Sequence, residues 1–125
     1  MGDAIDPIKF EFATALGNLS NQQAHNSQNE MALETATRAV ACFKEDEQLA
    51  SSVATSQFAE CLYTLAMRQK ESGLPPKALL TITECLRIFQ GRQMDEEINE
   101  EDKETAETLG RYRELQKELQ GFLSK

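Results

Sequence analysis

Apolar residues recur at intervals of three and four positions between residues 58 and 66. This is the spacing of one face of an amphipathic α-helix. Gly73 follows the stripe and suits the left-handed conformation that commonly ends a helix. Pro75 and Pro76 cannot continue that helix but fit the first turn of another. A second apolar stripe then runs from residue 78 to 89, so the pattern predicts an antiparallel helical hairpin with its tip near Gly73.

The same pattern occurs upstream. Small or apolar residues between positions 32 and 43 repeat the spacing of residues 78–89 at a displacement of 46 residues. The stripe before them, residues 12–17, parallels residues 61–66 at a displacement of 49. The two displacements differ by three residues. This difference predicts that the turn of the first hairpin, within residues 22–28, is three residues longer than that of the second. A first hairpin therefore precedes the second.

Two further features complete the predicted architecture. Ser27 and Glu30 have the spacing of a capping box, so the second helix of the first hairpin should begin near residue 28. Residues 49–54 continue a helical pattern, which predicts a lengthened helix at the start of the second hairpin. The chain is thus predicted to be one all-α domain, residues 1–125, with antiparallel helical hairpins at 8–46 and 47–90, an acidic loop at 91–102 and a closing C-terminal helix at 103–123.

The composition of the chain disfavours several classes of partner and location. The 125 residues are 40% hydrophobic and carry a net charge of −8, which disfavours direct binding of nucleic acid or an anionic membrane. No apolar run approaches the roughly 20 residues that cross a bilayer. The first ten residues lack the features of a secretory signal. Cys42, Cys61 and Cys85 fall on apolar helical faces without a C-x-x-C pair, which favours buried reduced thiols. We therefore expect a soluble intracellular protein, cytoplasmic in location and without membrane insertion.

Repeated hairpins with this pattern of small and large residues resemble tetratricopeptide (TPR) repeats. In the second copy, the family's Leu, Gly, Ala, aromatic and Ala positions hold Leu65, Ala66, Ala78, Ile82 and Cys85. The first copy offers Leu16, Gly17, Ala32, Ala36 and Ala39, and the closing helix offers Leu109, Gly110 and Tyr112. The chain departs from the family in having no Trp, no Pro at the repeat ends and a period of 44 to 49 residues. A helical bundle without repeats is the alternative.

The resemblance implies a short TPR-like array whose first helices line a partner-binding groove. Small residues, Gly17 and Ala66 among them, would let the two helices of a hairpin approach closely. Tyr63 and Met67 are candidate anchors, with core packing as the other interpretation. The groove positions implied by the resemblance are Glu11, Thr14, Asn18, Asn21, Glu60, Tyr63, Met67, Lys70, Glu107, Arg111 and Glu114.

The chemistry of this groove restricts the partner. One TPR subclass grips acidic chaperone tails with Lys, Asn and Arg, but this chain keeps only Asn18 of that set and places Glu104 where a base is needed. The acids among the groove positions instead favour a basic, mixed or amphipathic protein segment. Two hairpins and one closing helix leave apolar flanks uncovered, so we expect either self-association or a partner to cover them.

Catalysis finds little support in the sequence. The only histidine, His25, lies in a polar turn, and the chain has no phosphate-binding glycine loop or metal-ligand motif. The acids of residues 91–102 have the composition of a linker, although weak binding of a divalent ion is an alternative. We expect no enzyme activity, no cofactor and no structural metal. The predicted function is a protein–protein interaction adaptor or scaffold, and the alternative is a small dedicated chaperone or inhibitor that masks one partner.

Overall fold

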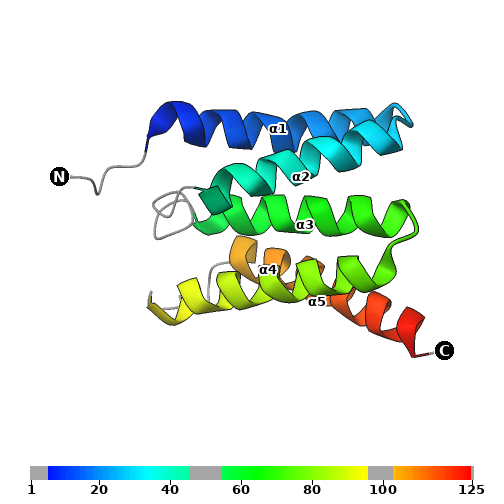
Figure 1. The fold of residues 1–125 in the computed structure, drawn as a ribbon. Coiled ribbons are helices and arrows are strands. Elements are labelled where there is room, and N and C mark those ends of the chain that lie inside the picture. The colour runs from blue at the N-terminus through cyan, green and yellow to red at the C-terminus, as the bar shows by residue number, and fades with distance from the viewer. Residues whose placement is uncertain (1–5, 46–54, 96–102, 125) are drawn as a thin grey trace.

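A computed structural model describes residues 6–45, 55–95 and 103–124, all of which belong to helices or their immediate ends. The helices are α1 (Pro7–His25), α2 (Asn29–Glu45), α3 (Thr55–Glu71), α4 (Pro75–Asp95) and α5 (Lys103–Leu123). Two antiparallel hairpins, α1–α2 and α3–α4, stack side by side, and α5 closes the stack against α4 (Figure 1). The predicted all-α class and the arrangement of two hairpins with a closing helix are confirmed.

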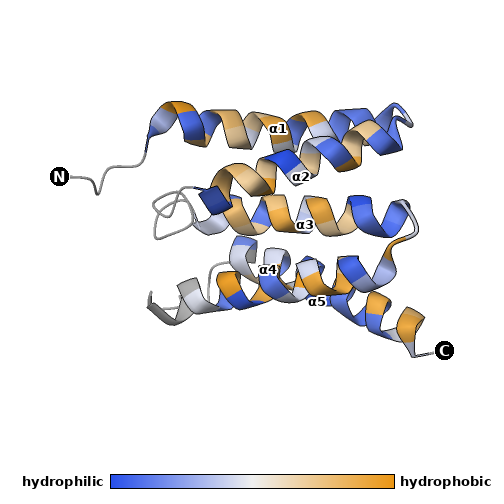
Figure 2. Ribbon diagram, in the orientation of Figure 1, coloured by the Kyte–Doolittle hydropathy of each residue, from blue (hydrophilic) through white to orange (hydrophobic). Residues whose placement is uncertain are grey.

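Sequence features explain where these helices form. The Asp6 side chain accepts hydrogen bonds from the backbone N–H groups of Ile8 and Lys9, and so caps the start of α1. Hydrophobic and hydrophilic residues alternate around each helix (Figure 2), as the apolar stripes predicted. The buried faces of all five helices meet in one core. The buried members of this core include Phe43, Leu62, Ile82, Leu115 and Leu119.

Both hairpins turn in the same way. Gly73 has a positive φ of 78°, and the N–H of Leu74 donates to the carbonyl of Gln69 at 2.8 Å. This is the Schellman arrangement that ends a helix. Ser27 takes the equivalent place after α1 with φ 62°, and the N–H of Gln28 donates to the carbonyl of Gln23 at 2.8 Å. The prediction of three extra residues in the first turn is therefore wrong, and Ser27 ends α1 rather than capping α2.

This equivalence changes the alignment of the two first helices. Because Ser27 and Gly73 are 46 residues apart, α1 and α3 are also related by 46 residues, so Ser20 corresponds to Ala66. The Ser20 hydroxyl is fully buried and donates to the carbonyl of Ala32 at 2.6 Å. A Cβ on Gly17 would lie 3.2 Å from the Cys61 sulfur. Ser20 is thus the small residue at the crossing of α1 and α2, whereas Gly17 gives room to α3.

Some of the other predicted boundaries agree with the structure, and others do not. The second helix begins at Asn29, close to the expected residue 28, and the closing helix covers the expected residues 103–123. The predicted acidic loop at 91–102 is wrong at its start, because α4 continues through Asp95. Residues 96–102, and the predicted helical extension at 49–54, lie outside the described residues. Gly110 is exposed with open space around it, so no close helix approach requires a glycine there.

Aromatic contacts join one hairpin to the next. The Phe43 ring at the end of α2 stacks on Phe58 of α3, with centroids 5.3 Å apart, and Phe10 of α1 meets the edge of Phe43 at 6.4 Å. In the second hairpin, Phe89 lies 46 residues after Phe43 and meets Tyr112 of α5 edge-on at 5.4 Å. Offset and edge-to-face pairs of this kind add about 0.5–1.5 kcal/mol beyond area burial. Each second helix therefore covers the following first helix through an aromatic pair.

None of the helices in the described part of the chain is both long and apolar enough to cross a membrane.

The left-handed residue after α3 gives a first prediction. Gly73→Ala should lower the free energy of unfolding by about 1 kcal/mol, because an alanine side chain clashes with the backbone at φ 78°. The same substitution at Gly110, inside α5 and facing open space, should raise stability by about 0.5–1 kcal/mol. Urea unfolding of both variants measures the two effects. Changes of the same sign would contradict the role assigned to Gly73.

Candidate functional site

One carboxylate of α3, that of Glu60, binds two side chains of the closing helix. Glu60 accepts a hydrogen bond of 2.5 Å from the Tyr112 hydroxyl and two from the Arg111 guanidinium at 3.3 and 3.5 Å. Tyr112 is 1% exposed, whereas Arg111 and Glu60 are about half exposed. The buried phenol therefore makes the more costly interaction to lose, since its hydroxyl has no access to water. We call Glu60, Arg111 and Tyr112 the carboxylate clamp.

Aromatic rings surround the clamp. The Tyr63 and Tyr112 rings lie 5.1 Å apart, and the guanidinium carbon of Arg111 is 5.2 Å from the centre of the Tyr63 ring. Burial, followed by the hydrogen bond to Glu60, raises the pKa of Tyr112 well above its ordinary value near 10. Tyr112 consequently remains a donor to Glu60 at all physiological pH values.

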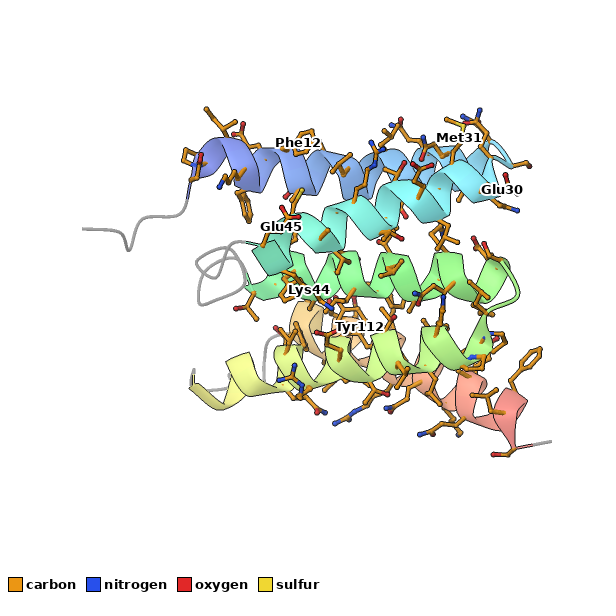
Figure 3. The ribbon with its side chains drawn as sticks, viewed as in Figure 1. Phe12, Glu30, Met31, Lys44, Glu45 and Tyr112 are labelled. Carbon is orange, nitrogen blue, oxygen red and sulfur yellow. The ribbon has the colours of Figure 1, made fainter. Side chains whose placement is uncertain are left out.

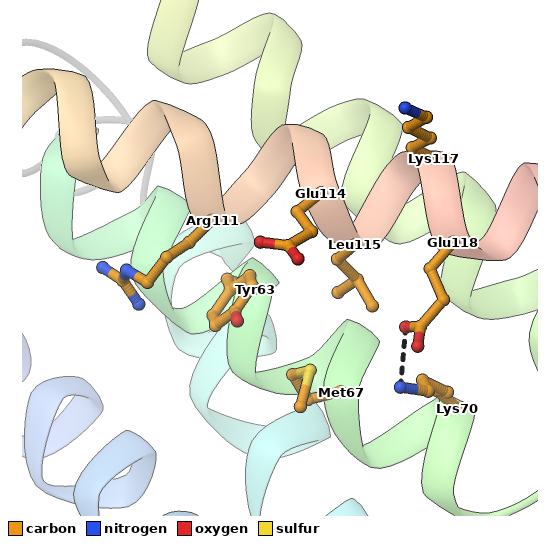
Figure 4. Close-up of a pocket in the computed structure, with 8 residues that line it drawn as sticks. All are labelled: Tyr63, Met67, Lys70, Arg111, Glu114, Leu115, Lys117 and Glu118. Atoms are coloured by element: carbon orange, nitrogen blue, oxygen red, sulfur yellow. Dashed lines mark ion pairs between the residues drawn. The ribbon is translucent and has the colours of Figure 1, made fainter.

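A hollow of about 490 Å³ opens beside the clamp, between α3 and α5 (Figure 4). Tyr63, Met67 and Leu115 supply its apolar surface. At the end away from the clamp, Lys70 of α3 forms a 2.7 Å ion pair with Glu118 of α5. The residues that line this hollow, here named the α3–α5 groove, are Tyr63, Met67, Lys70, Arg111, Glu114, Leu115, Lys117 and Glu118.

The charges of the α3–α5 groove are mixed, and the expected acidic groove is not found there. Arg111 and Lys70 are each paired with a carboxylate, and Glu114 points toward Tyr63, while Lys117 is directed away from the hollow (Figure 4). The five helices together contain 12 acidic and 12 basic residues. The net charge of −8 therefore comes from residues outside the helices. The groove is amphipathic and close to neutral.

A second hollow, of about 470 Å³, lies on the other side of the clamp. Its lining is more polar, with Ser56 and Gln57 from α3 and Thr105 and Thr108 from α5. Glu60 and Arg111 border it, and Arg111 lines both hollows. The clamp therefore forms the wall between an amphipathic groove and a polar one.

Only some of the predicted groove residues lie together in the structure. Tyr63, Met67, Lys70, Arg111 and Glu114 line the α3–α5 groove. Glu60 is used internally by the clamp.

The remaining predicted positions lie elsewhere. Glu107 lines neither hollow, and Glu11 and Asn18 are exposed on α1. The Thr14 hydroxyl is buried without a hydrogen-bond partner in the described structure. Asn21 borders a shallow hollow at the turn after α1, together with His25.

Sequence reasoning missed three residues of the groove, Leu115, Lys117 and Glu118. It also missed the clamp role of Tyr112. Arg111, Glu114, Leu115 and Glu118 are spaced by three and four residues, so they share one face of a helix. Extending the predicted set along that face was a signal available in the sequence. The pairing of Tyr112 with Glu60 had no such signal, because 52 residues separate them.

No group of three or more His, Cys, Asp or Glu in the described residues is placed to hold a metal ion. The three cysteines are free; Cys61 and Cys85 are buried, and Cys42 is half-buried. Burial raises the pKa of the Cys61 thiol to about 12, and the Cys85 thiol donates to the carbonyl of Ala59 at 3.1 Å. These two thiols are protonated at neutral pH, which makes them poor nucleophiles.

Comparisons of this chain with protein-family models, with curated proteins and with solved structures found no match.

The clamp predicts a pH-dependent loss of stability. Tyr112→Phe should lower the free energy of unfolding at pH 8 by about 1–2 kcal/mol, because the hydrogen bond to Glu60 is lost. Tyr112 has a raised pKa in the folded protein, so the unfolded chain releases the proton first as pH rises above about 10. The advantage of the wild type over Tyr112→Phe should then shrink by up to about 1.4 kcal/mol per pH unit.

Urea unfolding of both proteins at pH 8 and pH 11 measures this change. All other titrating groups are common to the two proteins. The difference between their free energies of unfolding therefore reports the Tyr112 phenol alone. A difference that stays constant between the two pH values would show that the folded protein does not hold the Tyr112 phenol in its protonated form.

Proposed function

We propose that this chain is an intracellular, non-enzymatic protein–protein interaction module, an adaptor or scaffold of TPR-like design that binds a partner segment in the α3–α5 groove. The observation that carries the proposal is the placement of Tyr63, Met67 and Leu115 together in an open hollow bordered by charged groups. Aromatic and methionine side chains are frequent anchors of protein interfaces. The three cysteines are free thiols and two of them are buried, which agrees with a reducing compartment such as the cytoplasm.

The groove favours an amphipathic partner segment. Its apolar surface would receive one or two large apolar side chains, and its rim offers charges of both signs. Lys70 and Arg111 are already paired with Glu118 and Glu60, so a ligand gains little from them without breaking an internal ion pair. Glu114 has no such pair in the described structure and would attract a basic residue at the edge of an otherwise apolar segment. The charge balance of the groove thus supports an amphipathic ligand over a purely basic one.

Groove geometry has a further consequence for how the ligand lies. The hollow runs between α3 and α5, from the clamp at Arg111 to the ion pair of Lys70 with Glu118. A helical segment with apolar residues at positions i, i+3 and i+4 would match a hollow bounded by two helices. The small size of the apolar patch favours affinities in the micromolar range, typical of reversible adaptors.

A dedicated chaperone or inhibitor is the second candidate. Phe122 near the end of α5 is 61% exposed and Leu80 on α4 is 73% exposed, so apolar surface remains at the closing end of the stack. A protein that masks one partner permanently would use such surface in addition to the groove. Co-purification with one protein in a fixed stoichiometry would favour this candidate, whereas several partners in exchange would favour the adaptor.

A substitution in the groove tests the proposal. Met67→Glu introduces a charge into the apolar part of the α3–α5 groove and should weaken partner binding at least tenfold, the loss typical of an interface anchor. Partners are captured from an extract with the wild-type chain, identified, and titrated against both proteins by calorimetry. Glu60 is unsuitable for this test because its substitution would break the clamp.

Met31→Glu is the matched control, because Met31 is 51% exposed on α2, away from the groove. It should leave binding unchanged, and thermal unfolding of both variants verifies that each is folded. Equal binding by the wild type and Met67→Glu would remove the groove from the proposal. Equal loss in both variants would indicate a general effect rather than an anchor.

A further inference from the structure

An apolar stripe on α1 faces away from every other described helix. Ile8, Phe12 and Leu19 are 77%, 58% and 42% exposed, and Ala15 between them is also exposed. Figure 3 shows Phe12 on the outer side of α1. Single exposed apolar residues are normal on a protein surface, but a continuous row of them on one helix face marks an interaction surface. We call Ile8, Phe12, Ala15 and Leu19 the α1 stripe.

The internal repeat shows what kind of surface this is. At the displacement of 46 residues, Phe12 and Leu19 correspond to Phe58 and Leu65 of α3, which are only 4% and 8% exposed. Those residues are covered by the first hairpin, where Phe43 stacks on Phe58. The α1 stripe is therefore the same stacking face, and no described helix covers it. Its natural occupant is another helix.

The spacing of the α1 stripe fits a second copy of the same helix. Ile8, Phe12, Ala15 and Leu19 are separated by four, three and four residues, a sequence of spacings that reads the same in both directions. Alternating steps of four and three also form the seam of a coiled coil. When two copies of α1 pair antiparallel about a two-fold axis, Ile8 lies opposite Leu19 of the second copy. Phe12 then lies opposite Ala15 of the second copy, so the largest side chain meets the smallest.

Charge does not oppose this pairing. The only Lys and Glu of α1 are Lys9 and Glu11. In the antiparallel register Lys9 lies opposite Asn18 of the second copy, and Glu11 lies opposite Leu16. Like charges that faced each other across the axis would destabilise such a pair. In this register no like charges do so.

We infer that the α1 stripe is a homodimer surface, on which two copies of this chain pair antiparallel through α1. The inference rests on α1 and is independent of the function proposed for the α3–α5 groove, so failure of either leaves the other standing. Two-fold dimers with the same patch on both subunits are the commonest oligomers. One helix face is smaller than the roughly 800 Å² per partner of a standard interface, so the dimer should dissociate on dilution into the micromolar range.

Sedimentation equilibrium of the full chain between about 1 and 500 µM tests the inference at the concentrations expected for such an interface. The wild type should shift from monomer to dimer, and Phe12→Glu should raise the dissociation constant at least tenfold. Leu80→Glu is the matched control, because Leu80 is an exposed apolar residue on α4 outside the stripe, and its dimer should remain. A wild type that stays monomeric throughout, including one whose stripe binds a different protein, would overturn the inference. A dimer that survives Phe12→Glu would overturn it as well.

A cross-linking experiment tests the antiparallel register. Ile8→Cys and Leu19→Cys are prepared as separate proteins, and a mixture of the two should form a mixed disulfide dimer under mild oxidation in higher yield than either protein alone. A disulfide requires Cα atoms about 4.4–6.8 Å apart, which the antiparallel pairing provides for residues 8 and 19 but not for two copies of residue 8. Wild type oxidised in parallel accounts for the native cysteines. Efficient cross-linking of Ile8→Cys alone would indicate a parallel pair and contradict the proposed register.

Discussion

The aromatic contact between each second helix and the following first helix is the interaction on which the stack depends. Phe43 on Phe58 joins the first hairpin to the second, and Phe89 on Tyr112 joins the second hairpin to α5. An isolated hairpin of this length buries only one flank of each helix, so the contact to its neighbour supplies much of the apolar burial that makes the helices stable. This mutual burial sets the order of the stack, because each second helix packs against the first helix that follows it in the chain.

The carboxylate clamp strengthens the attachment of α5, which among the described helices packs mainly against α4. A helix that packs on only one side is held less firmly than one between two neighbours. Glu60 offsets this by accepting the Tyr112 hydroxyl and the Arg111 guanidinium at one end, and Lys70 pairs with Glu118 at the other. The α3–α5 groove lies between these two attachments. The same contacts that fix α5 therefore determine the length of the groove and the apolar side chains that it exposes.

The two ends of the stack differ because of the direction of the chain. At the closing end, α5 covers α4 and carries the clamp. At the opening end, α1 has an uncovered face with the same residues that α3 buries, Phe12 and Leu19 in place of Phe58 and Leu65. The groove and the α1 stripe lie on different helices, so binding in the groove and pairing through α1 are compatible in one molecule. The net negative charge lies outside the helices and leaves both surfaces close to neutral.

The sequence by itself determined the helices, the two hairpins and the closing helix, because apolar periodicity and turn residues act over a few positions. The resemblance to TPR repeats also placed Tyr63, Met67 and Arg111 on one surface, and all three line the α3–α5 groove. Sequence reasoning misjudged the register of α1 by three residues, since Ser27 gave no sign that it adopts the left-handed conformation of Gly73. Only the tertiary structure showed that Glu60 belongs to a clamp rather than a binding surface. Its partners, Arg111 and Tyr112, lie 51 and 52 residues away, and such contacts depend on how helices pack rather than on any local pattern.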